Sequence, residues 1–177
     1  MQSLLDTITK RYSPYSFEEK NISMEDLNTL LDAARRAASS YNEQPWRFIY
    51  ATRDNKEEWN RMLDILVPQN REWAKNASVL MLSIAKKTSI VTGKPNPYSV
   101  HDTGMAMGNL LNQATSMGIY VHQMGGYDRS KAINNLNIPD EYQPVAMIAL
   151  GYPDKNEKRE DTPRNPLNSF VFKGIWK

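Results

Sequence analysis

The stretch SSYNEQPWRFIYA, residues 39–51, changes character halfway along its length. Its first part is rich in hydroxyl and amide side chains and ends in a proline, which is typical of a connection. From Trp46 to Ala51 the residues are mostly aromatic and apolar, which predicts a β-strand. Hydroxyls and amides placed just before a strand can hydrogen-bond the edge of a planar heterocycle. On this stretch alone, an ordinary polar connection is an equally good interpretation.

Two helices are predicted before this stretch. Ser23, with Asp26 three residues later, is close to a capping box and indicates a helix start. The apolar residues that follow recur at helical spacing and form one stripe: Leu27, Leu30, Leu31, Ala34 and Ala38. A shorter helical segment is expected over residues 3–10.

Four further elements are expected between residues 54 and 118. Asp54 is predicted to cap a helix that stops near Pro68. The continuous apolar run 78–85 is typical of a strand that is buried on both faces. Gly and Pro residues mark 86–100 as a long loop, a candidate lid. Asp102 is predicted to cap a buried helix ending at Gly118.

The last elements are two strands, over residues 119–124 and 145–150, and a short helix capped by Asp128. Helices and strands alternate without a regular βαβ series, so we expect an α+β fold with a mixed central sheet flanked by helices. The length of 177 residues fits one domain, which we place at 1–177.

Charge and composition exclude several classes of function. The 22 Lys and Arg nearly balance the 20 Asp and Glu, which argues against a nucleic-acid partner. The absence of cysteine excludes thiolate chemistry, and two histidines are too few for most metal sites, so we expect no metal. No apolar run is long enough to span a bilayer, and the N-terminus lacks the apolar core of a signal peptide. We therefore expect a soluble cytoplasmic protein with no membrane partner.

Two more stretches carry side chains or backbone suited to a ligand. Arg11 and Ser13 stand two residues apart after the first helix, where a guanidinium and a hydroxyl can reach one phosphate. The alternative is a capping turn with a surface arginine. Gly125 and Gly126 follow a predicted strand, where backbone N–H groups can approach a ligand closely. A plain turn is the alternative there.

Taken in order, these stretches resemble the FMN-dependent nitroreductase family. Its opening signature, Arg-x-Ser-x-(Arg/Lys)-x-Phe, is matched at Arg11, Ser13 and Phe17. Its second signature, roughly Ala-Pro-Ser-(Ser/Gly)-x-Asn-x-Gln-Pro-Trp-x-Phe, is matched at Ala37, Ser39, Ser40, Asn42, Gln44, Pro45, Trp46 and Phe48. The helix, strand and glycine pair over 102–126 and a closing Arg-x-Pro-Leu over 164–167 complete a resemblance that covers nearly the whole chain.

The resemblance implies a homodimer with exchanged C-terminal tails and one FMN at each of two interface sites. By motif, Arg11, Ser13 and Arg164 would hold the phosphate and ribityl chain. Ser39, Ser40 and Asn42 would line the flavin from the partner subunit, and Asn70 would meet its polar edge. Gly125 would donate its N–H to flavin N5. The full expected set of cofactor-binding residues is Arg11, Tyr12, Ser13, Tyr15, Ser39, Ser40, Asn42, Asn70, Met124, Gly125, Gly126 and Arg164.

The implied activity is hydride transfer from NAD(P)H through flavin N5 to a small planar acceptor, such as a nitroaromatic or quinone, with ping-pong turnover. Such chemistry needs orientation and electrostatics but no catalytic side chain, so none is predicted. His101 and His122 are interpreted as cap or core residues. Tyr98 is a candidate for stacking on substrate or a plain loop tyrosine.

Two departures from the family pattern keep alternatives open. Tyr15 stands where the family usually has Arg or Lys, and Thr162 stands where some relatives have a second phosphate-binding Lys. They motivate one alternative, a non-catalytic FMN-binding protein. The short lid leaves open another, a specialised flavoenzyme of the same fold, of dehalogenase or oxidase type.

Overall fold

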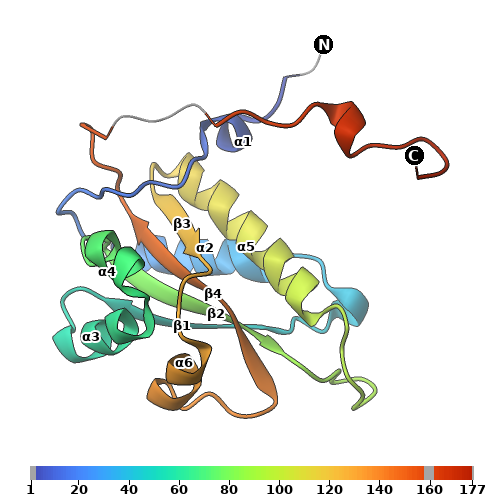
Figure 1. The fold of residues 1–177 in the computed structure, drawn as a ribbon, viewed down its shortest axis with the longest axis horizontal. Coiled ribbons are helices and arrows are strands. Elements are labelled where there is room, and N and C mark those ends of the chain that lie inside the picture. Colours follow the sequence, from blue (N-terminus) through green and yellow to red (C-terminus); the bar gives the residue numbers. More distant parts are fainter. Residues whose placement is uncertain (1–2, 158–161, 177) are drawn as a thin grey trace.

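A four-stranded antiparallel sheet forms the centre of the computed structural model, which describes residues 3–157 and 162–176 (Figure 1). Its strands are β1 (Trp46–Thr52), β2 (Val79–Lys86), β3 (Tyr120–Met124) and β4 (Tyr142–Gly151), in the order β1-β2-β4-β3. The expected α+β class is confirmed. The expected mixed sheet is corrected to an antiparallel one for these four strands, because each adjacent pair runs in opposite directions.

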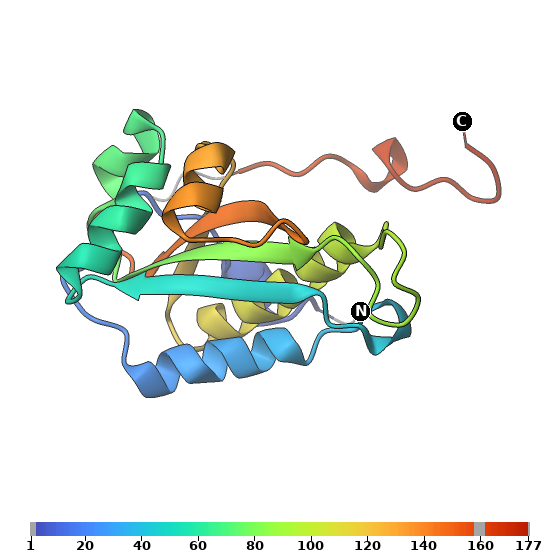
Figure 2. The same ribbon diagram turned by 90° about the horizontal axis from the view of Figure 1, so that it is seen from below.

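Helices cover both faces of the sheet, as Figure 2 shows. One face packs against α2 (Met24–Arg35) and α5 (Ser99–Ser116). The other face packs against α3 (Lys56–Ile65), α4 (Pro68–Ala74) and α6 (Arg129–Asn135). Outside these layers are the short α1 (Asp6–Lys10) and two 3₁₀ turns, Ser40–Asn42 and Leu167–Ser169.

Strand β2 explains the continuous apolar run at 78–85. Val79 and Met81 belong to the core on the α2 and α5 face, whereas Leu80 and Leu82 belong to the core on the α3 face. Because successive side chains of a strand point to opposite faces, a strand with helices on both sides needs apolar residues throughout. The prediction of a strand buried on both faces is therefore confirmed.

Several predicted helix ends are correct. Ser23 caps α2, and its Oγ accepts the backbone N–H of Asp26 at 3.0 Å. Asp128 caps α6 in the same way through Lys131. Gly118 follows α5 with φ +70°, the left-handed geometry that glycine adopts without strain.

Two predicted helix starts, at Asp54 and Asp102, are wrong, whereas the predicted stop near Pro68 is correct. Asn55, not Asp54, caps α3, because its side chain is the one that reaches the N–H of Glu58. Pro68 does not only stop a helix but begins α4, where its missing N–H costs nothing. Helix α5 begins at Ser99, so Asp102 lies in its first turn instead of capping it.

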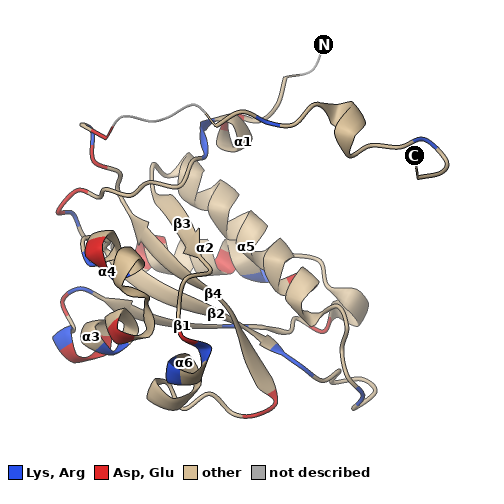
Figure 3. Ribbon diagram, in the orientation of Figure 1, with Lys and Arg blue, Asp and Glu red and all other residues tan. Residues whose placement is uncertain are grey.

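Figure 3 shows acidic and basic residues along α3, and basic residues on α6 next to it. Two ion pairs illustrate the mixing: Arg61 with Glu57 at 2.7 Å on α3, and Lys131 of α6 with Asp64 of α3 at 3.1 Å. On these two helices, basic side chains are therefore paired with acidic ones and do not form one basic face.

The cap of α2 can be tested by substitution. Ser23→Ala removes the acceptor for the Asp26 N–H, so we expect a loss of about 1 kcal/mol in the free energy of unfolding. Urea denaturation of the two proteins measures the difference. Asn28→Ala, an exposed change within the same helix, should not lower stability. Equal stability of Ser23→Ala and the wild type would show that water replaces the cap without cost.

Candidate functional site

The segment 11–17 lies along β3, at one edge of the sheet. The ring of Tyr12 packs on that of Tyr120, with ring centroids 4.7 Å apart. The ring of Tyr15 meets His122 edge-on at 4.6 Å. Phe17 forms a β-bridge with Pro153, just beyond β4. These contacts place the half-buried Arg11 and the exposed Ser13 at the β3 edge.

An aromatic cluster of Tyr15, Trp73 and His122 holds this segment in place. Trp73 of α4 lies 4.4 Å from the His122 ring and 5.1 Å from the Tyr15 ring, between centroids. The Nδ1 of His122 lies 2.9 Å from the carbonyl oxygen of Pro14. Because a carbonyl oxygen can only accept, Nδ1 carries the proton. Sequence reasoning missed Trp73, because helix α4 was not predicted and the aromatic partners of Trp73 lie on other elements.

The glycine pair lies at the end of β3 and is backed by Asn70. The Nδ2 of Asn70 donates to the carbonyl oxygen of Gly126 at 3.0 Å. A Cβ on Gly126 would lie 2.6 Å from that Nδ2, so only glycine permits this approach. A Cβ on Gly125, in contrast, would meet no atom within 4 Å. The backbone of Gly125 is thus open to a planar ligand, next to the buried Met124.

The connection carrying Ser39, Ser40 and Asn42 has an unusual backbone. Tyr41, Asn42 and Gln44 have φ values of 51°, 54° and 47°, in the left-handed region that such residues rarely adopt. Each costs roughly 1–3 kcal/mol and persists only where the surroundings fix it. Two hydrogen bonds help to fix this backbone. The N–H of Gln44 donates to Oγ of Ser39 at 3.0 Å, and the N–H of Asn42 donates to the carbonyl oxygen of Ser39.

Within one protomer, the connection that carries Ser39, Ser40 and Asn42 lies far from the segment 11–17. The N–H of Ser40 donates to Asp102 in the first turn of α5, whereas Tyr12 packs at the start of β3, beyond the last turn of α5. The 18 residues of α5 span roughly 27 Å. Figure 1 shows the two segments at opposite ends of this helix.

The expected tail residue, Arg164, lies on a C-terminal segment that extends away from the sheet (Figures 1 and 2). It is exposed, and its Nη1 donates to the carbonyl oxygen of Thr162 at 2.9 Å. The same segment exposes large apolar side chains, among them Phe170 and Trp176.

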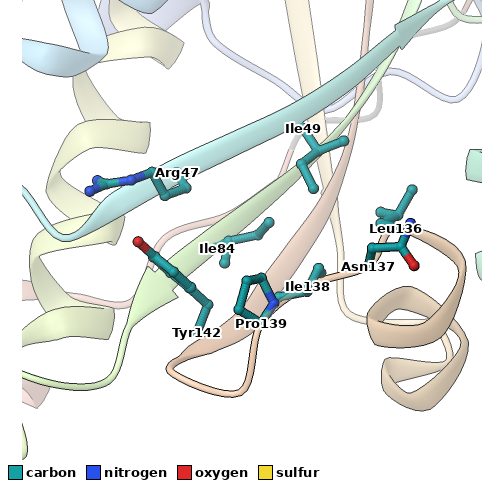
Figure 4. Close-up of a pocket in the computed structure, with 8 residues that line it drawn as sticks. All are labelled: Arg47, Ile49, Ile84, Leu136, Asn137, Ile138, Pro139 and Tyr142. Atoms are coloured by element: carbon teal, nitrogen blue, oxygen red, sulfur yellow. The ribbon is translucent and has the colours of Figure 1, made fainter.

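A separate pocket of about 140 Å³ lies on the sheet face that carries α6 (Figure 4). Its lining is mostly apolar and includes Ile49, Ile84 and Tyr142, with the guanidinium of Arg47 5.8 Å from the Tyr142 ring. The volume is below the roughly 300–1,000 Å³ of common cofactor and ligand sites. It contains none of the residues that the sequence indicated for ligand binding.

Burial lowers the pKa of His122 below its ordinary value of 6.5. The unfolded chain therefore takes up a proton near pH 6.5 while the folded protein does not, so stability falls as the pH drops from about 6.5 toward the folded pKa. We expect His122→Gln to lose this part of the pH dependence, as measured by urea denaturation between pH 5 and pH 8. Gln123→Ala, an exposed change on the same strand at a residue that does not titrate, is the control and should keep the wild-type pH dependence. Identical pH profiles for all three proteins would contradict the assignment.

An open glycine backbone, backed by an amide, follows the strand along which a segment with an arginine and a hydroxyl lies. A guanidinium and a hydroxyl are side chains suited to a phosphate. The chain belongs to the nitroreductase family, whose model matches residues 8–152. A protein of Archaeoglobus fulgidus, named for NADH dehydrogenase or NAD(P)H nitroreductase activity, is 32% identical over 89% of each chain. The FMN reductase [NAD(P)H] of Bacillus subtilis is 23% identical over 95% of this chain and 73% of its own.

Solved structures agree with this membership. The structure of an oxidoreductase containing FMN is 33% identical to the chain, with a TM-score of 0.91 over 99% of this chain and 94% of that one. A nitroreductase family protein of Clostridium difficile 630 shares the fold, with a TM-score of 0.81 over 99% and 100% of the two chains at 22% identity. Within residues 3–157 and 162–176, no helix has the length and apolar character needed to cross a membrane.

Proposed function

We propose that the protein is an FMN-dependent oxidoreductase that takes hydride from NAD(P)H and delivers it to a small planar, electron-poor acceptor. The observation that carries this proposal is the open backbone at Gly125, which lies near the Asn70 amide and directly follows the strand that holds the segment 11–17. The donor set also suits the cofactor, since a guanidinium and a hydroxyl are good partners for a phosphate. Family membership and the FMN-containing relative support the same conclusion.

The candidate residues would bind different parts of the cofactor. Arg11, Ser13 and Arg164 would bind the phosphate and ribityl chain, and Asn70 would orient the ring by its polar edge. Bound FMN supplies a ring that accepts hydride at N5 and releases it again. The N–H of Gly125 would donate at that position, and the open space above this backbone would admit first the nicotinamide and then the acceptor.

The complete site requires a second copy of the chain. Ser39, Ser40 and Asn42 lie at the other end of α5 from the segment 11–17, so they would serve the site of the partner subunit. Exposed apolar side chains in the segment 4–8, on α5 and on the tail would be covered in such a homodimer: Leu4, Leu5, Ile8, Val100, Met105, Leu167, Phe170, Val171, Ile175 and Trp176. Tail exchange would bring Arg164 to the partner.

The dimer can be tested at Met105, which is 46% exposed on α5. Met105→Glu would bury an unpaired charge in the interface, so we expect the dimer dissociation constant to rise at least roughly tenfold and FMN to be released with it. Sedimentation equilibrium, with and without FMN, measures both. Asn28→Glu on the outer side of α2 is the control. A Met105→Glu protein that stays dimeric would show that Met105 lies outside the dimer interface.

A visible absorption spectrum tests the activity. The purified protein, supplied with FMN, is recorded under anaerobic conditions before and after addition of NADPH or NADH, then after a quinone or nitroaromatic. We expect a flavin spectrum that bleaches with a nicotinamide and recovers with the acceptor. A protein that takes up no FMN would contradict the proposal.

The Tyr15 position favours one second candidate, a flavoprotein with a specialised reaction or a binding role. An aromatic cluster of Tyr15, Trp73 and His122 occupies the place where the family pattern has a cation at Tyr15. Without a fixed positive charge, a reduced and negatively charged flavin is less stabilised. Bound FMN that neither nicotinamide reduces would select this candidate.

A further inference from the structure

Glu43 is a buried carboxylate in the middle of the strained connection. It is 8% exposed and stands between Asn42 and Gln44, both of which have positive φ. Its Oε2 accepts a hydrogen bond from Nδ2 of Asn96 at 2.9 Å, and its Oε1 accepts one from Oγ of Ser89. Both carboxylate oxygens are thus bonded to neutral donors of one loop. A buried carboxylate is costly to desolvate, so these donors are what stabilise it there.

The two donors are the residues around which the loop 87–98 is built. Asn96, itself 8% exposed, donates its N–H to the carbonyl of Lys87 at 2.8 Å and accepts the N–H of Tyr98 through Oδ1 at 3.0 Å. The Oγ of Ser89 accepts the N–H of Thr92 at 3.0 Å. A change at either donor would therefore alter the loop and its bond to Glu43 together.

A second buried carboxylate holds the other side of the connection. Asp102, 3% exposed in the first turn of α5, accepts the N–H of Ser40 at 2.9 Å. Helix α5 follows the loop directly in the chain. Its first turn bonds to Ser40, just before the left-handed residues, and the loop bonds to Glu43, which lies among them. Such residues keep their conformation only while their surroundings hold them.

We propose that Glu43 is a positioning residue that couples the loop 87–98 to the connection carrying Ser39, Ser40 and Asn42. The inference rests on the proposed function in one respect, namely that these three residues line FMN. When the carboxylate is bonded to the loop, the connection is held in the geometry that presents them. When the loop is released, the connection relaxes and their hydroxyl and amide groups move out of place. The loop, although far from Arg11, thereby influences cofactor affinity.

Substitutions on both sides of this bond test the coupling. We expect Glu43→Ala and Asn96→Ala each to raise the FMN dissociation constant about tenfold, measured by flavin fluorescence. The double variant should bind no more weakly than the weaker single variant, because both changes break one unit. Glu43→Gln should stay within about threefold of wild type, because the Ser89 hydroxyl can accept from the new amide as well as donate. Glu141→Ala, at an exposed glutamate near the loop, is the control.

A second readout needs no cofactor. We expect trypsin to cleave the Glu43→Ala and Asn96→Ala proteins faster after Lys87 than the wild type, and the Glu43→Gln and Glu141→Ala proteins at the wild-type rate. A protein weakened only in global stability would be cleaved faster at sites throughout the chain, and its urea midpoint would fall to a matching extent. If Glu43→Ala does not fold, Asn96→Ala and Glu43→Gln still give both measurements.

The outcomes separate this inference from the proposed function. A wild type that binds no FMN contradicts the proposed function, whereas the tryptic rates still decide whether Glu43 holds the loop. A wild type that binds FMN, with unchanged affinity in Glu43→Ala and Asn96→Ala, overturns the coupling alone. Additive losses in the double variant also overturn it, because independent sites add.

Discussion

Replacement of Arg11 by alanine is expected to weaken FMN binding by about 1.5–3 kcal/mol, or roughly 10- to 150-fold in dissociation constant. The expectation follows from the place of Arg11 at the β3 edge, on a segment fixed by Tyr12, Tyr15 and Phe17. A charge-assisted hydrogen bond from a guanidinium to a phosphate is among the strongest that a protein side chain makes. Fluorescence titration of FMN against the variant measures the loss.

The matched control is Arg61→Ala, which removes a guanidinium paired with Glu57 on the surface of α3. It should leave FMN affinity unchanged. Arg164→Ala is expected to weaken FMN binding by about as much as Arg11→Ala does, because the resemblance assigns both arginines to the same phosphate. Wild-type affinity in both the Arg11 and the Arg164 variants would contradict the phosphate assignment.

The second large effect is expected at Gly151, the last residue of β4. A Cβ there would lie 2.5 Å from Cδ1 and 3.1 Å from Cγ of Phe17. The Phe17 ring is rigid and buried, so it cannot swing aside as a flexible side chain would. We expect Gly151→Ala to lower the free energy of unfolding by about 1–3 kcal/mol, as overpacked cores do. Urea denaturation measures this loss.

The same substitution should also weaken FMN binding, because Phe17 anchors the segment that carries Arg11 and Ser13. Gly125→Ala is the informative comparison. A Cβ at Gly125 meets no protein atom within 4 Å, so stability should stay within about 0.5 kcal/mol of wild type while the approach of a planar ligand is obstructed. Full stability in Gly151→Ala would mean that the Phe17 ring moves freely, and that the segment is held by its other contacts alone.

Local sequence was informative about structural features that residues close together in the chain determine, such as the ends of helices. The side chain of Ser23 reaches a backbone N–H three residues away, and the left-handed residue after α5 favours glycine at 118, so both ends could be predicted. The misplaced cap at Asp54 shows the limit of this reasoning. Adjacent Asp and Asn are equally good caps, and the choice depended on the path of the chain entering α3.

The candidate ligand-binding segments could be predicted from motifs, but their arrangement in space could not. Asn70 and Gly126 meet across 56 positions of sequence, and His122 meets Pro14 across 108. Trp73 was missed because its role depends on α4 packing beside β3. No periodicity within one segment encodes a contact of that kind, since the partner lies on another element.

The sequence by itself determined the α+β class, the buried central strand, the family resemblance and the segments that carry the candidate ligands of FMN. These depend on local chemistry: hydrophobic pattern, capping and short motifs. Only the tertiary structure decided that Asp102 and Glu43 are buried anchors of the connection 39–44, and that this connection lies at the opposite end of α5 from the segment 11–17. The physical reason is that the residues next to a carboxylate in the sequence do not show whether it will lie on the surface or in the core. Its role depends on the donors that the fold brings to it.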